Sequence, residues 1–300
     1  MTPAGVSFAH AEDGERTATV TGTLPPGSPD YVYSPSRRDR NPRAVSRPAA
    51  YRDPVLKLIE TYYDAVPRSA ARAEEFGPLT LFVREGAGWP YYARPALGYG
   101  GEVTVADVDR VRARQRELGV PEAFEWVAET TPGLRAAVEA SGLTVHEHPL
   151  MVLEGEGLPV AGPEDVTVRM VGARDPFLAS AVAAPYAAFG AEPDPDTVAR
   201  VADRITAGLT HLSAALDATG TALSAGQHQP VGAVSEVVGV GTVPAARRRG
   251  LGLAVTAALV ADARSRGVEL VFLSASDADV ARLYGRLGFR TVATALIAEA

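Results

Sequence analysis

The alternation of apolar and polar residues divides the chain into short segments with helical or strand periodicity. Between residues 51 and 153 the pattern predicts, in chain order, a helix from Asp53, strands at 79–83 and 89–94, a helix at 105–118, a strand at 123–127, a helix at 132–140 and a strand at 143–153. Asp53 and Pro54 suit the start of the first helix, as its cap and its first-turn proline.

A second series of elements begins at residue 166. The pattern predicts, in chain order, a strand at 166–171, helices at 175–189 and 196–208, strands at 211–217, 221–227 and 234–243, a helix at 250–266, a strand at 268–274, a helix at 278–286 and a strand at 289–297. This order is typical of an α/β (α+β) fold in which helices pack on a mixed sheet. Both halves end in helix, strand, helix and strand, with glycines after the helices, so we expect a duplicated fold.

Composition shifts predict the domain boundaries. Residues 1–50 have little apolar periodicity and contain a run of arginines and prolines, so we expect a flexible arm there. Residues 154–165 are rich in glycine, proline and acidic groups and are the expected linker. The linker separates a domain at 51–153 from a domain at 166–300.

Charge and composition exclude several function classes. The net charge of −7 argues against general nucleic-acid binding. The absence of cysteine excludes disulfides, thiolate zinc sites and cysteine nucleophiles. His146 and His148 have no third ligand nearby in the sequence, so we expect no metal site. No signal peptide or membrane span is recognisable, which predicts a cytoplasmic protein without a membrane partner.

One segment carries a recognisable pattern of chemistry. An apolar strand runs to Val243, Pro244 ends it, and a turn with three arginines leads through Gly250 and Gly252 into an apolar helix. Free amides at a helix start, glycines without Cβ atoms and arginines together suit a pyrophosphate. An ordinary turn with solvated arginines is the alternative. A dinucleotide site is disfavoured because the third glycine of its spacing is replaced by Val255.

This segment resembles the signature of the GNAT superfamily of acyl-CoA N-acyltransferases, Arg/Gln-x-x-Gly-x-Gly/Ala, at Arg247 to Gly252. A second motif, from Asp277 through Leu283-Tyr284 to Gly288-Phe289, resembles the downstream Asn-x-x-Ala-x-x-Leu-Tyr-x-x-x-Gly-Phe of the same family. It departs from that motif at Asp277, where asparagine is usual, and at Val280, where alanine is common. The resemblance covers residues 166–300, and the first half resembles a degenerate copy. It implies two halves, each with a twisted mixed sheet flanked by helices.

The resemblance implies acetyl-CoA as co-substrate. The amides expected to hold its pyrophosphate belong to Arg248, Arg249, Gly250, Leu251, Gly252 and Leu253, next to Arg247. The segment of Gly241, Thr242 and Val243 would pair with the pantetheine arm, beside a bulge near Gly239-Val240. Asp277 would cap the next helix beside the cofactor. Tyr284 matches the general acid for the leaving thiolate, and a core aromatic is the alternative interpretation.

The general base is predicted at Glu236, near the start of the pyrophosphate strand, because an amine must lose a proton before it attacks a thioester. A solvated glutamate is the alternative, and His228 is a second candidate base. Asp277, Asp279 and Tyr186 could line the acceptor side.

Together these features predict an acetyl-CoA-dependent N-acetyltransferase that works by direct attack in a ternary complex, with the acceptor unidentified. A non-catalytic acetyl-CoA-binding regulatory or interaction protein is the alternative. An enclosed acidic pocket would indicate a small-molecule amine, and a broad groove a peptide amine. A homodimer is compatible with the sequence.

Overall fold

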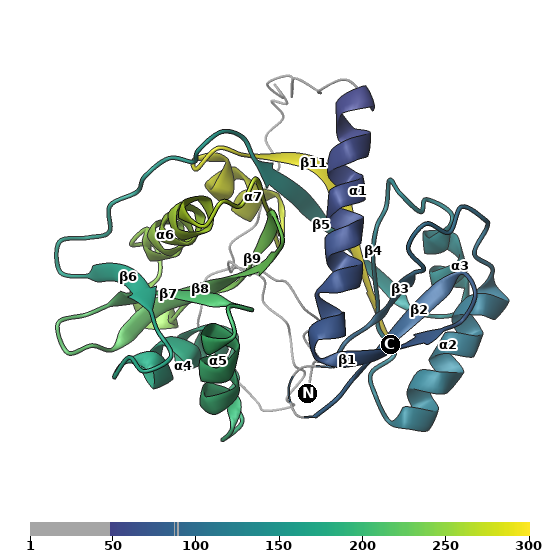
Figure 1. Cartoon of the computed structure of the whole chain (residues 1–300), viewed down its shortest axis with the longest axis horizontal. Helices are drawn as coiled ribbons and strands as arrows, with labels where there is room; N and C mark the ends of the chain where they lie inside the picture. Colours follow the sequence, from purple (N-terminus) through teal and green to yellow (C-terminus); the bar gives the residue numbers. More distant parts are fainter. Residues whose placement is uncertain (1–48, 87, 89) are drawn as a thin grey trace, which may run out of the picture.

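The computed structural model describes residues 49–86, 88 and 90–300, and these form one sheet of eleven strands in the order β1-β2-β3-β4-β11-β5-β10-β9-β8-β7-β6 (Figure 1). The expected arm lies outside the described residues, apart from its last two positions. The mixed sheet flanked by helices is the fold class that the sequence predicts.

The first half contributes five strands. Its elements are α1 (Ala49–Ala65), β1 (Ala71–Glu75), β2 (Leu79–Arg84), β3 (Ala93–Pro95), α2 (Val105–Leu118), β4 (Phe124–Val127), α3 (Leu134–Ala140) and β5 (Thr144–Leu153). β1, β2 and β3 are antiparallel neighbours, and β3 pairs with β4 in parallel.

The second half repeats this order with one extra strand, β6, and one extra helix before its three antiparallel strands. Its elements are β6 (Thr167–Val171), α4 (Leu178–Ala188), α5 (Thr197–Thr206), β7 (His211–Leu216), β8 (Ala222–Val231), β9 (Val234–Thr242), α6 (Leu251–Ser265), β10 (Leu270–Ser274), α7 (Ala278–Gly285) and β11 (Phe289–Glu299). β7, β8 and β9 are antiparallel neighbours, and β9 pairs with β10 in parallel. The matching order and pairing support the duplicated fold.

The last strand of each half lies in the sheet of the other half. β5 lies between β10 and β11, and β11 lies between β4 and β5, all as antiparallel neighbours. The two halves are therefore interleaved, while residues 154–166 carry no helix or strand and connect β5 to β6.

Alternation of side chains along the strands divides the helices between two faces of the sheet. Val271 and Leu273 of β10 pack in one core cluster with α6 and Tyr284 of α7, whereas Leu270 and Phe272 pack in another with α1. In the same way α2 and α3 share one cluster, and α4 lies against the opposite face of β7 and β8 from α6. Figure 1 shows α1 crossing the sheet where the two halves meet.

Several predicted elements differ from those of the structure, most clearly in the first half. α1 begins at Ala49, so Pro54 lies inside the helix and not in its first turn; a proline there deprives only the carbonyl of Ala50 of its helical donor. β1 is not predicted because its sequence, ARAEE, has no apolar alternation, as is common for an edge strand. The strand expected at 89–94 is β3, Ala93–Pro95, and residue 89 itself lies outside the described residues.

None of the helices in the described part of the chain combines the length and the hydropathy that crossing a membrane requires.

The interleaving predicts that a change in the last strand destabilises the first half. Leu296 of β11 is 2% exposed, pairs in register with Trp126 of β4 and packs in the cluster beneath α2 and α3. Leu296→Ala is expected to lower the free energy of unfolding by roughly 2–5 kcal/mol, because it leaves a cavity there. Denaturant unfolding, followed by Trp126 fluorescence in a Trp89→Phe background and by far-ultraviolet circular dichroism, measures this.

Both signals should move together to lower denaturant concentration. Leu58→Ala, at a side chain that is 48% exposed, is the control and should leave both midpoints nearly unchanged. A shift in only one of the two signals for Leu296→Ala would show that the halves unfold independently.

Candidate functional site

The parallel strands β9 and β10 pair over only part of their length. Their register runs from Val234↔Leu270 to Glu236↔Phe272, while β9 continues to Thr242. Beyond Glu236, β9 stays paired with β8 alone among the described strands. The two parallel strands therefore separate towards their carboxyl ends, in the middle of the second half.

A bulge in β9 accompanies this separation. Gln227↔Val238 and Ala225↔Gly241 are consecutive pairs with β8, so two residues of β9, Gly239 and Val240, lie opposite one residue of β8. Gly239 has φ +61°, a conformation that favours glycine. The bulge predicted at Gly239-Val240 is confirmed.

The turn after β9 presents its backbone amides outward. A short 3₁₀ turn, η2 (Pro244–Ala246), leads to Arg248 with φ +59° and then to Gly250 with φ +78°, which is the N-cap of α6. No side chain caps this helix. Within the described residues, the amides from Arg248 to Leu253 donate to no backbone carbonyl. The first helical backbone bond comes from Ala254 to the Gly250 carbonyl, at 3.1 Å. This is the arrangement that binds an anion at a helix N-terminus.

The three arginines of the turn have different surroundings. The Arg247 guanidinium donates to the carbonyl of Ala188, at the end of α4, at 3.1 Å, and to that of Thr242 at 3.5 Å. Arg249 forms an ion pair with Asp165 at 2.7 Å, and Arg248 is exposed. Arg247 therefore holds the turn against the end of α4. The exposed positive charge of the turn belongs to Arg248 and Arg249.

Gly252 lies where α6 approaches the end of β9. A Cβ atom at this position would be 3.5 Å from Thr242 Oγ1 and 3.7 Å from Val240 Cγ1, which are ordinary contacts. A larger side chain would fill the space between the helix start and the strand. Gly241, by contrast, lies so close to α4 that a Cβ atom would be 2.8 Å from Pro185 Cα.

The second motif supplies a cap and a buried aromatic. Asp277 Oδ1 accepts hydrogen bonds from the amides of Asp279 at 2.8 Å and Val280 at 2.9 Å, so the predicted cap of α7 is confirmed. Tyr284 is 3% exposed and packs in the core cluster beneath α6. Burial raises the pKa of Tyr284 far above its ordinary value, and a hydrogen bond with the Thr256 side chain opposes this rise.

Glu236 lies on the opposite face of the sheet from α6, against α1. Its side chain is buried, 1% exposed, and its Oε1 accepts a hydrogen bond from Tyr63 Oη at 3.3 Å. Tyr63 Oη also lies 3.4 Å from Ser274 Oγ, at the end of β10. Burial and the negative charge of Glu236 raise the pKa of Tyr63 well above its ordinary value. The solvated glutamate considered from the sequence is therefore wrong.

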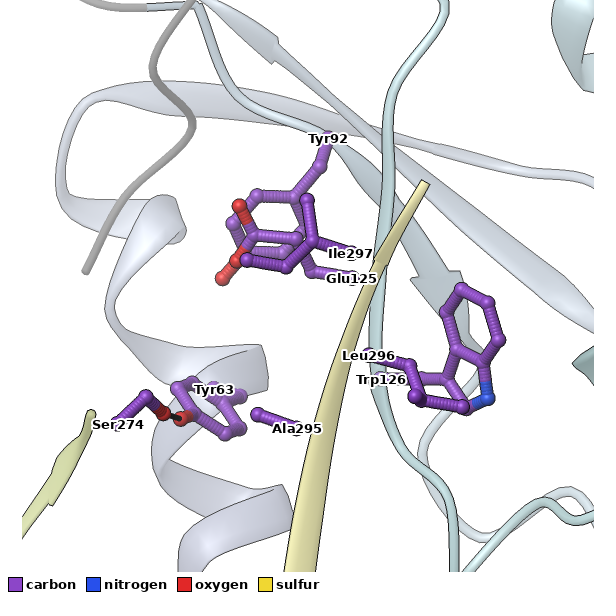
Figure 2. A pocket seen from close by; sticks show the side chains of 8 residues that line it. All are labelled: Tyr63, Tyr92, Glu125, Trp126, Ser274, Ala295, Leu296 and Ile297. Atoms are coloured by element: carbon purple, nitrogen blue, oxygen red, sulfur yellow. Dashed lines mark hydrogen bonds between the residues drawn. The ribbon is translucent and has the colours of Figure 1, made fainter. Parts of the chain in front are cut away.

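A pocket lies next to this hydrogen-bonded group, where the two halves meet (Figure 2). Its empty volume is about 310 Å³, and this volume includes space open to solvent. The lining residues are Tyr63, Tyr92, Glu125, Trp126, Ser274, Ala295, Leu296 and Ile297. Figure 2 shows Glu125 and Tyr92 on the same side of β11 as Tyr63 and Ser274.

The sequence did not indicate this pocket. Tyr63, Tyr92 and Glu125 belong to the first half and match neither motif. Asp277, Asp279 and Tyr186, the expected acceptor-side residues, are not among its lining residues.

His228, the second candidate base, lies on the face of the sheet that α6 covers. Its Nε2 donates to Asp262 at 2.9 Å, while its Nδ1 accepts from Ser235 Oγ at 2.9 Å. His211 stacks on it with ring centroids 4.8 Å apart, and Arg266 binds Asp262 at 2.6 Å. The ligand-type atoms of His211, His228 and Asp262 lie within 4.8 Å of one another. These residues therefore form a buried hydrogen-bonded network on the opposite face of the sheet from Glu236.

This network predicts acid-sensitive stability. Burial lowers the pKa of His228 from 6.5 to about 4, with Asp262 opposing the shift. Below pH 6.5 the unfolded chain therefore binds a proton that the folded chain does not, so stability present at pH 7 is lost on acidification. Between pH 7 and 5 this residue should lower the free energy of unfolding by roughly 1–2 kcal/mol. Denaturant titrations at both pH values measure the difference.

His228→Gln should reduce this difference, whatever its effect at pH 7. The control is His146→Gln, at an exposed histidine, which should retain the difference of the parent protein. An unchanged difference in His228→Gln would contradict the assignment.

Residues 217–297 match the family model described as FR47-like protein. No curated protein matches the chain by sequence.

Solved structures resemble the chain over most of its length. The chain is similar to a GCN5-related N-acetyltransferase from Kribbella flavida, at 25% identity and a TM-score of 0.64, over 82% of this chain and 95% of that one. It is also similar to a GCN5-related N-acetyltransferase from Sphaerobacter thermophilus, at 17% identity and a TM-score of 0.53, over 74% and 80%. A tandem GNAT protein from the clavulanic acid biosynthesis pathway has 16% identity and a TM-score of 0.53, over 74% and 78%. The last two likenesses concern the fold alone.

Proposed function

We propose that this chain, which belongs to the GNAT superfamily, transfers an acetyl group from acetyl-CoA to a primary amine. The observation that carries the proposal is the uncapped N-terminus of α6 beside the separated end of β9. The superfamily fold implies acyl-CoA binding, and this turn is where the chain offers free amides to a pyrophosphate.

The residues around the turn fit the donor. The amides from Arg248 to Leu253 donate to no backbone carbonyl of the described residues and would bind phosphate oxygens, and Gly252 leaves space for them beside β9. Arg248 and Arg249 add positive charge. The segment from Gly241 to Val243 would lie along the pantetheine arm, because β9 has left β10 there.

Glu236 is our proposed general base. Most of its side chain is excluded from water, and it lies at the last pair before the strands separate, so an amine entering from the α1 face would meet it. Glu236 would accept the proton of the ammonium group, and the neutral nitrogen would then bond to the acetyl carbon. The carbon–sulfur bond then breaks, and the thiolate leaves with the electron pair. The nitrogen loses its second proton, and the thiolate takes up a proton to become the free thiol.

The role of Tyr284 as general acid rests only on the resemblance of its motif to that of the GNAT superfamily. Its hydroxyl is buried in the core, and a phenol with a raised pKa gives up its proton less readily. A thiol has a pKa of about 8.5, so a thiolate leaves near neutral pH with little need of an acid. We therefore propose that Tyr284 mainly packs α7 against α6.

Direct measurement tests the function. Calorimetry with acetyl-CoA measures donor binding, and detection of free thiol in the presence of a broad panel of amines measures transfer. The proposal fails if neither is seen. Binding of acetyl-CoA without thiol release from any amine would instead favour a regulatory or interaction protein.

Gly252→Val should weaken acetyl-CoA binding at least tenfold. The added side chain would occupy the space between the start of α6 and β9, where phosphate oxygens need to approach the amides. Ala261→Val, at an exposed position of the same helix, is the matched control and should bind like the parent protein. Calorimetry at one pH measures both, and equal affinities would place the donor elsewhere.

Glu236→Gln should lower kcat by roughly 10²–10⁴-fold at pH 7, because the amide cannot accept the amine proton. The loss should shrink at pH 9.5, where more of the amine is already neutral, while the dissociation constant of acetyl-CoA stays the same. The rate of thiol release, measured as a function of pH for both proteins, tests this expectation. A loss that is equal at both pH values would contradict the role of base.

A further inference from the structure

We propose that the pocket between the two halves binds the ammonium group of a small primary amine, with Glu125 of the first half as its ion-pairing carboxylate. This inference rests on the proposed function and names the class of its acceptor. It also gives the first half, which carries neither motif, a direct part in substrate binding.

The pocket is built from both halves. Tyr63 comes from α1, Tyr92 from the segment before β3, and Glu125 from β4, while Ser274 ends β10 of the second half. β11 forms the remaining wall. Because these elements meet through the interleaved strands, the pocket exists only when both halves are folded together.

Carboxyl groups outnumber guanidinium groups near the pocket. Burial and the charge of Glu236 raise the pKa of Glu125, while Arg94 opposes this rise. Arg94 is 1% exposed and is already paired with Glu60, whose backbone carbonyl it also binds at 3.1 Å. Glu125 thus faces the carboxyl group of Glu236 and a guanidinium that Glu60 already binds, and a cationic ligand beside Glu125 would favour its ionised form.

Glu125 also lacks a partner. Its Oε1 is buried and has no hydrogen-bond partner among the residues that the structure describes. Leaving such an atom unpaired is costly, so polar atoms of this kind usually meet a ligand or water. An ammonium group carries three donors and would satisfy it.

The aromatic walls suit the same ligand. Tyr63 and Tyr92 line the pocket together with Glu125, and Figure 2 shows all three on the same side of β11. Aromatic faces attract cations, and the Arg94 guanidinium already lies 5.7 Å from the centre of the Tyr63 ring. Carboxylate and tyrosine together favour a cation over a neutral molecule of the same shape.

The pocket also leads to the base. Tyr63 Oη contacts both Ser274 at the pocket wall and Glu236 Oε1. Tyr63 therefore connects the lining of the pocket, which includes Glu125, to the group that would take the proton of the amine. The carboxyl and tyrosine lining of this pocket fits the ammonium group of a small amine, whereas a peptide acceptor would need a broad groove.

Binding of n-butylammonium chloride to the full chain saturated with CoA tests the proposal. Calorimetry should show saturable binding to the parent protein, at least tenfold weaker binding to Glu125→Gln, and no binding of n-butanol, the neutral molecule of similar shape. The control is Glu85→Gln, at an exposed carboxylate, which should bind like the parent. Acetyl-CoA affinity and the unfolding midpoint should stay unchanged in Glu125→Gln.

Two results would overturn the inference. One is equal n-butylammonium affinity in the parent and Glu125→Gln; the other is no preference for n-butylammonium over n-butanol. If Glu125→Gln proves unstable, Tyr92→Leu, which keeps the carboxylate but removes the aromatic wall, should still weaken binding severalfold. Either failure, in a protein that binds acetyl-CoA and releases thiol with amines, leaves the proposed function standing. Loss of acetyl-CoA binding in the parent protein would defeat the function itself.

Discussion

The antiparallel pairing of β5 with β11 is the interaction on which the rest of the structure depends. It runs from Leu153↔Phe289 to Thr144↔Glu299, and each strand also borders the parallel pair of the other half. Neither half can therefore complete its sheet alone. The pairing also brings α1 of the first half over β9 and β10, and Tyr62 of α1 donates to the carbonyl of Gln229 in β8 at 2.8 Å.

The separation of β9 from β10 gives the sheet two functional faces. The uncapped start of α6 lies on one face, and Glu236 with Tyr63 lies on the other. Adjacent side chains of a strand point to opposite faces, so a short stretch of β9 serves both. In our proposal the donor and acceptor approach from these faces and meet in the gap, which makes positioning the main contribution to the rate.

Local patterns predicted much of this arrangement. The glycines and Pro244 around the turn, the bulge at Gly239 and the cap at Asp277 depend on neighbours in the sequence, and all three features occur as expected. The pocket could not be predicted in this way. Tyr63 and Glu236 are 173 residues apart, and only the exchange of strands brings them together. No periodicity or motif in a single sequence reports such a contact.

The side chains of the motif mostly support the fold. Arg247 holds the turn against Ala188, and Tyr284 packs beneath α6, so the groups left to bind a donor are mainly backbone amides. Backbone amides can recognise a pyrophosphate but cannot distinguish one acceptor from another. In our proposal the choice of acceptor depends on residues outside the motif, and the buried, unpartnered carboxyl oxygen of Glu125 is the group that would recognise a cation.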